Sequence, residues 1–245
     1  MNALKMLTGI AATATLAFAA PAFADSITLG SGDIGSSFSL NYDGFSNGTT
    51  IAGLTGSTTF TLTGVSGNDY TFDYNVANTS SAPVTDSRIS SFAFNTDPTI
   101  SSATSTGAFA YTTLSSNYPN GIGTVDVCFK DAQTGSCAGG ASGGLTLGQT
   151  GTGSFTLSFS APVSALTLSD FYVRYQSITG VPGISSASGA GTIGTTSGGS
   201  TGGSTGGSTG GTPVPEPGML GLLGASLLGL AMARRRKAPA RALAA

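Results

Sequence analysis

The two cysteines, Cys128 and Cys137, are the residues of this 245-residue chain whose type and spacing most readily suggest chemistry. Eight residues separate them, whereas redox-active pairs are typically separated by two. In a domain outside the cytoplasm, a single pair of cysteines is typical of one disulfide. Closing so short a loop would stabilise the fold by about 2–3 kcal/mol. We therefore expect a structural disulfide between them, with a redox site as the second interpretation.

Catalytic residues are scarce in the rest of the sequence. There is no histidine and the only glutamate is Glu216, so a Ser-His-Asp triad and a His-ligated zinc site are excluded. A glycosidase-type carboxylate pair would have to be two aspartates. Lys130 is the one lysine between the two terminal segments that could act as a base for a serine. We expect a protein that is not an enzyme and has no cofactor.

Two pairs of aspartates could contribute to a Ca²⁺ site, which takes six to eight oxygen ligands. These pairs are Asp126 with Asp131 and Asp69 with Asp73. Neither has the spacing of an EF-hand or of a calcium-binding nonapeptide repeat. We therefore expect solvated aspartates and predict no metal site. The glycine-rich run at residues 139–144 is not followed by Gly-Lys-Ser/Thr, so it predicts a turn rather than a phosphate-binding loop.

Alternation of apolar and polar residues predicts β-strands over the middle of the chain. Phe60 and Leu62 alternate with threonines, and the same period of two recurs at residues 70–76, 124–129, 154–159 and 171–175. Val, Phe, Tyr and Thr favour the pleated surface of a sheet, and outside the two terminal segments no stretch has a helical period. We expect about nine or ten short strands in an antiparallel β-sandwich. A β-barrel and a β-solenoid are the alternatives, although a solenoid would require a regular repeat.

The N-terminus has the organisation of an export signal. Lys5 precedes an apolar run at residues 6–20, and the small residues Ala22 and Ala24 form an A-x-A cleavage site. We expect residues 1–24 to be a signal peptide that signal peptidase removes, so that Asp25 becomes the first residue of the mature chain. An uncleaved anchor is the alternative, but the apolar run is shorter than the roughly 20 residues of a membrane span.

The C-terminus combines three features in a fixed order. Pro215-Glu216-Pro217 is followed by 16 uncharged, Gly- and Leu-rich residues at 218–233, and then by Arg234, Arg235, Arg236 and Lys237. As a helix, the apolar segment would be about 24 Å long, and snorkelling arginines could extend it across the membrane. The positive-inside rule would keep the arginine cluster in the cytoplasm. We expect one transmembrane helix and a cytoplasmic tail at residues 238–245.

Taken together, residues 213–237 resemble the PEP-CTERM sorting signal. The resemblance implies recognition and processing near Pro215-Glu216-Pro217 by an exosortase, a membrane protease or transpeptidase of Gram-negative bacteria. It also implies an inner-membrane intermediate, transfer to the cell surface or release, and an association with exopolysaccharide. A permanent membrane anchor preceded by a proline-rich spacer is the alternative. The stretch from Cys128 to Gly140 is similar to the cistern subgroup of these proteins, and this similarity implies no biochemical activity.

Between the terminal signals the sequence predicts a domain and a tether. Three Ser-Thr-Gly-Gly repeats at residues 200–211 cannot bury apolar surface. We expect residues 185–212 to be a flexible linker with a reach of about 30 Å, which leaves residues 25–184 as the β domain. This domain has ten aspartates and three cationic residues, for a net charge of −7. Such a surface argues against nucleic acid as a partner.

The tyrosines leave a second function open. Aromatic rings can stack on sugars, and the domain contains seven tyrosines, some of which share strand faces with core-like Phe and Val: Tyr42, Tyr70, Tyr74, Tyr111, Tyr118, Tyr172 and Tyr175. The first hypothesis is an exported structural or adhesion protein of the surface matrix, with signal peptidase, exosortase and exopolysaccharide as partners. The second is a carbohydrate-binding module at the cell surface. A permanently anchored periplasmic domain is a further alternative.

Overall fold

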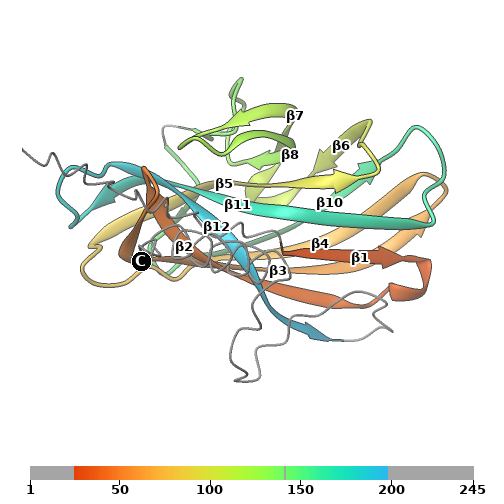
Figure 1. The fold of residues 1–245 in the computed structure, drawn as a ribbon, viewed down its shortest axis with the longest axis horizontal. Helices are drawn as coiled ribbons and strands as arrows, with labels where there is room; N and C mark the ends of the chain where they lie inside the picture. Colours follow the sequence, from red (N-terminus) through yellow and green to blue (C-terminus); the bar gives the residue numbers. More distant parts are fainter. Residues whose placement is uncertain (1–24, 141, 198–245) are drawn as a thin grey trace, which may run out of the picture. The chain divides into compact units, whose positions relative to one another are not determined.

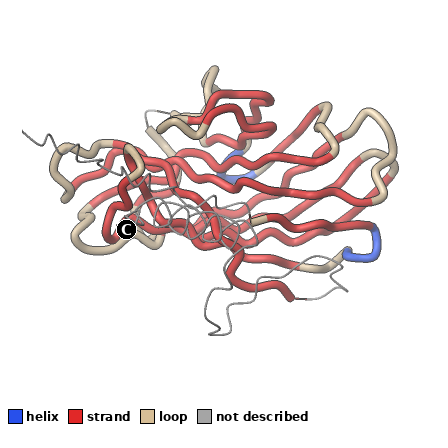
Figure 2. The backbone as a smooth tube through the Cα atoms, in the orientation of Figure 1, coloured by secondary structure: helices blue, strands red, loops and turns tan. Residues whose placement is uncertain are grey.

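The computed structural model describes residues 25–140 and 142–197. The predicted signal peptide, the Ser-Thr-Gly-Gly repeats, the sorting segment and the tail lie outside the described residues. Figures 1 and 2 show that this part of the chain is built from β-strands. Two short 3-10 helices and no α-helix occur among the described residues. The elements are β1 (Ser26–Gly30), η1 (Ser31–Asp33), β2 (Ser37–Ser46), β3 (Thr49–Ser66), β4 (Asp69–Asn78), β5 (Asp86–Asp97), β6 (Ser102–Ser105), η2 (Gly107–Phe109), β7 (Tyr111–Tyr118), β8 (Gly123–Lys130), β9 (Leu145–Thr146), β10 (Thr150–Ser158), β11 (Ala165–Thr179) and β12 (Ser186–Ser197).

The twelve strands belong to one sheet rather than to the two separate sheets of a sandwich. Ten of them follow in the order β6-β10-β4-β3-β2-β12-β11-β5-β8-β7, while β1 pairs with β11 and β9 with β5. The two ends of this order approach each other, because the hydroxyl of Thr112 in β7 donates to the carbonyl of Ala103 in β6 at 3.1 Å. The predicted all-β, antiparallel class is confirmed. The strands do not form the predicted two-sheet sandwich. They form one almost closed sheet, because hydrogen-bonded pairing continues without a break from β6 to β7 in this order.

The hydrophobic core lies inside this almost closed sheet, where side chains of β3 meet those of β5 and β11. The ring of Phe60 in β3 lies 5.6 Å from that of Phe92 in β5 and 6.3 Å from that of Phe171 in β11. Such distances are typical of favourable aromatic pairs. Phe60 and Leu62 are buried while the threonine between them is only partly buried, so the alternation in the sequence correctly predicts which side chains face the core.

Strand β12 corrects the predicted boundary between domain and tether. The twelve residues Ser186–Ser197 were expected in the linker at 185–212, yet they form a strand that pairs with both β11 and β2. Its small residues fit against aromatic rings: a Cβ atom on Gly191 would lie only 2.7 Å from Cε1 of Tyr42. The small residues of this stretch, which look like those of a linker, are small because the strand packs closely against aromatic rings. The predicted tether can therefore begin only after Ser197.

Candidate functional site

Most residues that could do chemistry gather beside β5, β8 and β11, away from the main core. A second, smaller hydrophobic cluster forms there from Ala93, Tyr118, Val125, Cys128 and Cys137. The segment from Asp131 to Gly144, which joins β8 to β9, is held against β5. The hydroxyl of Ser90 donates to the carbonyl of Ala138 at 2.7 Å, and the amide of Asp131 donates to the carbonyl of Ser90 at 3.1 Å. We call residues 131–140 and 142–144 the capping segment.

The two cysteines meet where the capping segment packs against β8. Cys128 lies in β8 and Cys137 in the segment itself, and both are buried free thiols. Burial raises the pKa of Cys128 well above its usual value, whereas the hydrogen bond from Cys128 lowers the pKa of Cys137. The structure therefore brings the predicted pair together without a bond between the sulfur atoms. That they form a disulfide in the exported protein stays a prediction.

Arg88 fastens the capping segment to the sheet. Its Nη1 lies 3.3 Å from Oδ2 of Asp131 and donates to the carbonyl of Gly143 at 2.6 Å. Its Nη2 donates to the carbonyl of Gly140 at 2.6 Å and to Oε1 of Gln176 at 2.8 Å. The amide of Gly140 in turn donates to Oδ1 of Asp131 at 2.6 Å. The glycine-rich run is thus a turn, as predicted, and it is built around a buried ion pair.

The other two cations of the described residues, Lys130 and Arg174, are also buried, and no carboxylate among those residues forms an ion pair with them. The ammonium of Lys130 is almost fully buried and donates to the hydroxyl of Thr113 and the carbonyl of Thr134, so it does not face a serine nucleophile. The guanidinium of Arg174 donates to the hydroxyl of Ser186 at 2.7 Å, and burial lowers the pKa of Arg174. Because all three cations of the described residues are buried, the accessible charges of this part of the chain are aspartates.

Asp126 and Asp131, one of the two aspartate pairs that could contribute to a Ca²⁺ site, bind different partners. Oδ2 of Asp126 accepts from the amide of Thr96 at 2.8 Å, and Asp131 is in the ion pair with Arg88. The expectation that Asp131 is solvated is therefore wrong, because its carboxylate neutralises a buried guanidinium. Within residues 25–140 and 142–197, no three His, Cys, Asp or Glu side chains gather as a metal site would require.

The tyrosines do not form a sugar-stacking platform among the described residues. Tyr172 is half-buried and its ring lies 5.7 Å from that of Tyr118, and Tyr111 in β7 is exposed. The remaining rings are in the interior together with Tyr118: Tyr42, Tyr70, Tyr74 and Tyr175. Packing of these rings in the core, the main role expected from the sequence, is thus confirmed for most of them.

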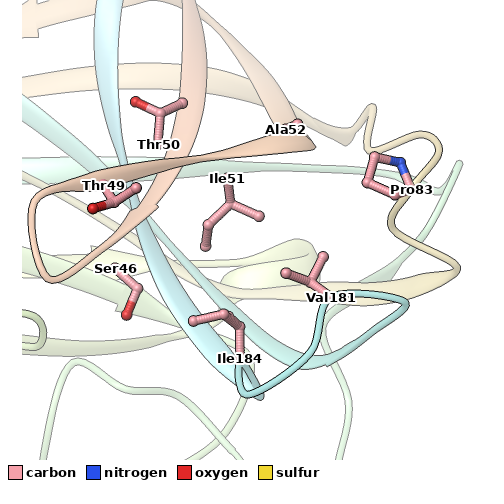
Figure 3. A pocket seen from close by; sticks show the side chains of 8 residues that line it. All are labelled: Ser46, Thr49, Thr50, Ile51, Ala52, Pro83, Val181 and Ile184. Atoms are coloured by element: carbon pink, nitrogen blue, oxygen red, sulfur yellow. The ribbon is translucent and has the colours of Figure 1, made fainter.

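A shallow apolar pocket of about 250 Å³ lies where β2 ends and β3 begins. Figure 3 shows that aliphatic side chains from three separate parts of the chain point into it. It is lined by Ser46, Thr49, Thr50, Ile51, Ala52, Pro83, Val181 and Ile184. No lining side chain is charged, so the pocket offers apolar contact but no catalytic group.

The outward face of β2, β3, β4 and β10 is an array of hydroxyl and amide groups that also contains the exposed carboxylate of Asp73. Cross-strand pairs hydrogen-bond to each other, with oxygen–oxygen distances of 2.7 Å for Ser37–Thr61 and 2.8 Å for Ser39–Thr59. The alternation of threonine with core residues in the sequence signals this array, but alternation by itself does not predict a binding surface. We call it the hydroxyl face; its members are Ser37, Ser39, Asn41, Ser57, Thr59, Thr61, Thr63, Thr71, Asp73, Asn75, Thr152, Ser154 and Thr156.

The predicted export and sorting residues all lie outside the described part of the chain. They are Ala22 and Ala24 at the signal-peptide cleavage site, and Pro215, Glu216, Pro217, Arg234, Arg235 and Arg236 in the sorting segment. The same holds for the predicted transmembrane helix. In the portion of the chain that the structure does describe, no helix is long and apolar enough to cross a membrane.

Comparison with known proteins supports the C-terminal assignment. Residues 213–237 match the PEP-CTERM protein-sorting motif over the whole of the predicted segment. No curated protein and no solved structure is significantly similar to the chain. The motif indicates a protein that is exported, processed by an exosortase, and sorted to the cell envelope or surface. The chain is therefore a PEP-CTERM sorting domain-containing protein.

Proposed function

We propose that the β domain is a structural or adhesive component of the cell surface or extracellular matrix, delivered there by its C-terminal sorting motif. The observation that carries this proposal is the PEP-CTERM match at residues 213–237. A sorting motif at the end of the chain requires a cargo, and residues 25–197 form a β domain with its own hydrophobic core. The domain is then the part that acts outside the cell.

The contacts of the reactive side chains support a role without catalysis. Arg88 and Asp131 neutralise each other, and Lys130 donates to Thr113 and Thr134. Cys128 lies in the interior beside the capping segment. Each of these groups holds one part of the fold against another, and such internal use is typical of structural rather than catalytic residues. In the proposed role the domain acts through its shape and its outer surface, in association with exopolysaccharide.

Two alternatives differ from this proposal in observable ways. A carbohydrate-binding module that works through stacked tyrosines loses support, because only Tyr111 has an exposed ring among the seven. A permanently anchored periplasmic domain would keep the arginine cluster after export. The fate of Arg234–Arg236 therefore distinguishes a processed surface protein from an anchored one.

The test is the intact mass of the protein in envelope and medium fractions of the native host. We expect a chain that starts at Asp25, after signal peptidase, and ends near Pro215-Glu216-Pro217, after exosortase. A variant with Pro215, Glu216 and Pro217 all changed to alanine should keep its C-terminus and stay in the membrane fraction. As a matched control, changing Pro162 and Pro182, which lie in loops of the β domain, should leave processing unchanged. A wild-type envelope form that retains Arg234–Arg236 would contradict the proposal and support the anchor.

A further inference from the structure

We propose that the hydroxyl face binds a neutral, extended polysaccharide that lies flat across β2, β3, β4 and β10. This inference rests on the proposed function, because it names the class of partner that a surface-matrix domain would contact. It is carried by three observations on the described residues: the regular placement of the polar groups, the hydrogen bonds that pair them, and the charge of the accessible surface.

The strand register places the polar side chains in rows across the sheet. One row contains Ser39 in β2, Thr59 in β3, Asn75 in β4 and Thr152 in β10. Neighbouring strands are about 4.8 Å apart, and side chains on one face repeat every ~6.7 Å along a strand. The result is a two-dimensional lattice of donors and acceptors. A linear polysaccharide presents hydroxyl groups of the same kind at every sugar, so it can form repeated hydrogen bonds across such a lattice.

The cross-strand pairs prepare these groups for binding. The hydroxyl oxygens of Thr71 and Thr156 are 3.0 Å apart, and those of Ser39 and Thr59 are 2.8 Å apart. A hydroxyl has one donor and two acceptor positions, so a paired hydroxyl still has capacity for a ligand. Because pairing already restricts the side-chain rotamers, less entropy is lost when a ligand binds. Each contact is weak, but many contacts to one chain add through multivalency.

The accessible charge favours a neutral polymer over an anionic one. Arg88, Lys130 and Arg174 are all buried, so the described residues expose aspartates without compensating cations. An anionic polysaccharide would be repelled by such a surface. An apolar partner is disfavoured as well, because the large hydrophobic residues that are exposed lie elsewhere, at Ile34, Tyr111 and Leu147. A neutral, hydroxyl-rich polysaccharide is not repelled by the aspartates and does not require an apolar surface.

The experiment measures co-sedimentation of the processed protein with two insoluble probes. Microcrystalline cellulose represents a neutral, extended polysaccharide, and calcium-free cross-linked alginate represents an anionic one. We expect binding to cellulose that persists at high salt and with EDTA, and none to alginate. A face variant with Thr59, Thr61, Thr71 and Thr156 changed to valine should bind cellulose at least about tenfold more weakly, which corresponds to ~1.4 kcal/mol.

A matched control variant makes the same number of threonine-to-valine changes in exposed, hydrogen-bonded threonine pairs elsewhere. Thr28 pairs with Thr167 at 2.9 Å and Thr85 pairs with Thr179 at 2.9 Å, and none of these residues belongs to the hydroxyl face. This control should bind cellulose like the wild type, and circular dichroism should show that both variants are folded. If one variant does not fold, Thr59→Val and Thr85→Val are compared as single changes.

Several outcomes would overturn the inference. These are equal binding by the face and control variants, no binding of the wild type to cellulose, binding to alginate, or binding that EDTA removes. A change of oligomeric state in the face variant alone would overturn it too, because the face would then be a contact between copies of the chain. A correctly processed mass without cellulose binding contradicts this inference and leaves the proposed sorting intact. Cellulose binding by a chain that retains Arg234–Arg236 contradicts the sorting and leaves this inference intact.

Discussion

Arg88 in β5 and Asp131 after β8 form an ion pair whose side chains are only 7% and 2% exposed, with 3.3 Å between Nη1 and Oδ2. Both partners also bind the backbone of Gly140, Arg88 through its carbonyl and Asp131 through its amide. A glycine-rich segment with little apolar surface of its own is thereby tied to the sheet. The stability of the capping segment therefore depends on electrostatic and hydrogen-bonding contacts more than on burial of side chains.

Removing one partner of this pair should destabilise the protein strongly. Asp131→Asn leaves a guanidinium buried without a counter-charge, and such changes lower the free energy of unfolding by about 3–5 kcal/mol. Urea denaturation followed by circular dichroism measures the loss. Asp73→Asn, at an exposed carboxylate of β4, is the matched control and should change the free energy by less than about 0.5 kcal/mol. Equal effects of the two changes would mean that the pair adds nothing to the fold.

Residues 186–197 should be required for folding, although their composition resembles a linker. Gly191→Val places new carbon atoms against Tyr42 and Phe171 and should lower the free energy of unfolding by about 1–3 kcal/mol. Gly32→Ala, at a position with no atom within 4 Å of the new Cβ, is the control and should be near neutral. A chain that stops at Ile184 should fail to fold, because β2 and β11 would lose their shared partner. A folded product of that length would show that β12 is dispensable.

The two cysteines should form a disulfide once the protein is exported. The protein isolated with thiols blocked should be lighter by two hydrogen atoms than its reduced form, and tandem mass spectrometry should link Cys128 to Cys137. Changing both to serine should lower the free energy of unfolding by about 2–3 kcal/mol, the value expected for a short loop. Treating the wild type with a reductant supplies the control, and its loss should be similar. In a further check, the protein is unfolded without a reductant and treated with a thiol-labelling reagent. Full labelling of both cysteines would disprove the disulfide.

Alkaline pH should unfold the domain together with ionisation of its buried tyrosines. Burial raises the pKa of Tyr118 and of Tyr175 well above the ordinary value of about 10. The unfolded state therefore releases protons near pH 10 while the folded state retains them, so stability is unchanged below about pH 10 and falls as the pH rises above it. Tyrosinate absorbance and circular dichroism should change together. Full ionisation of all seven tyrosines near pH 10, with the fold retained, would contradict the buried placement.

The sequence alone determined the destination of this protein and its structural class. The sorting motif, like the predicted signal peptide, is a local pattern along the chain, so no fold is needed to detect it. Strand content follows from local alternation as well, because a residue such as Phe60 and its neighbouring threonines point to opposite sides of any strand.

Only the tertiary structure decided which segments meet, because strand order and register depend on contacts between distant residues. The position of β12 between β2 and β11 is invisible in the sequence, since glycines packed against Tyr42 and Tyr175 look the same as glycines of a linker. The burial of Arg88, Lys130 and Arg174 could not be predicted either, because most of their partners are backbone carbonyls and hydroxyls that the fold brings to them from loops and from β12. The single continuous sheet, and the hydroxyl face on its outer side, arise from the same long-range pairing.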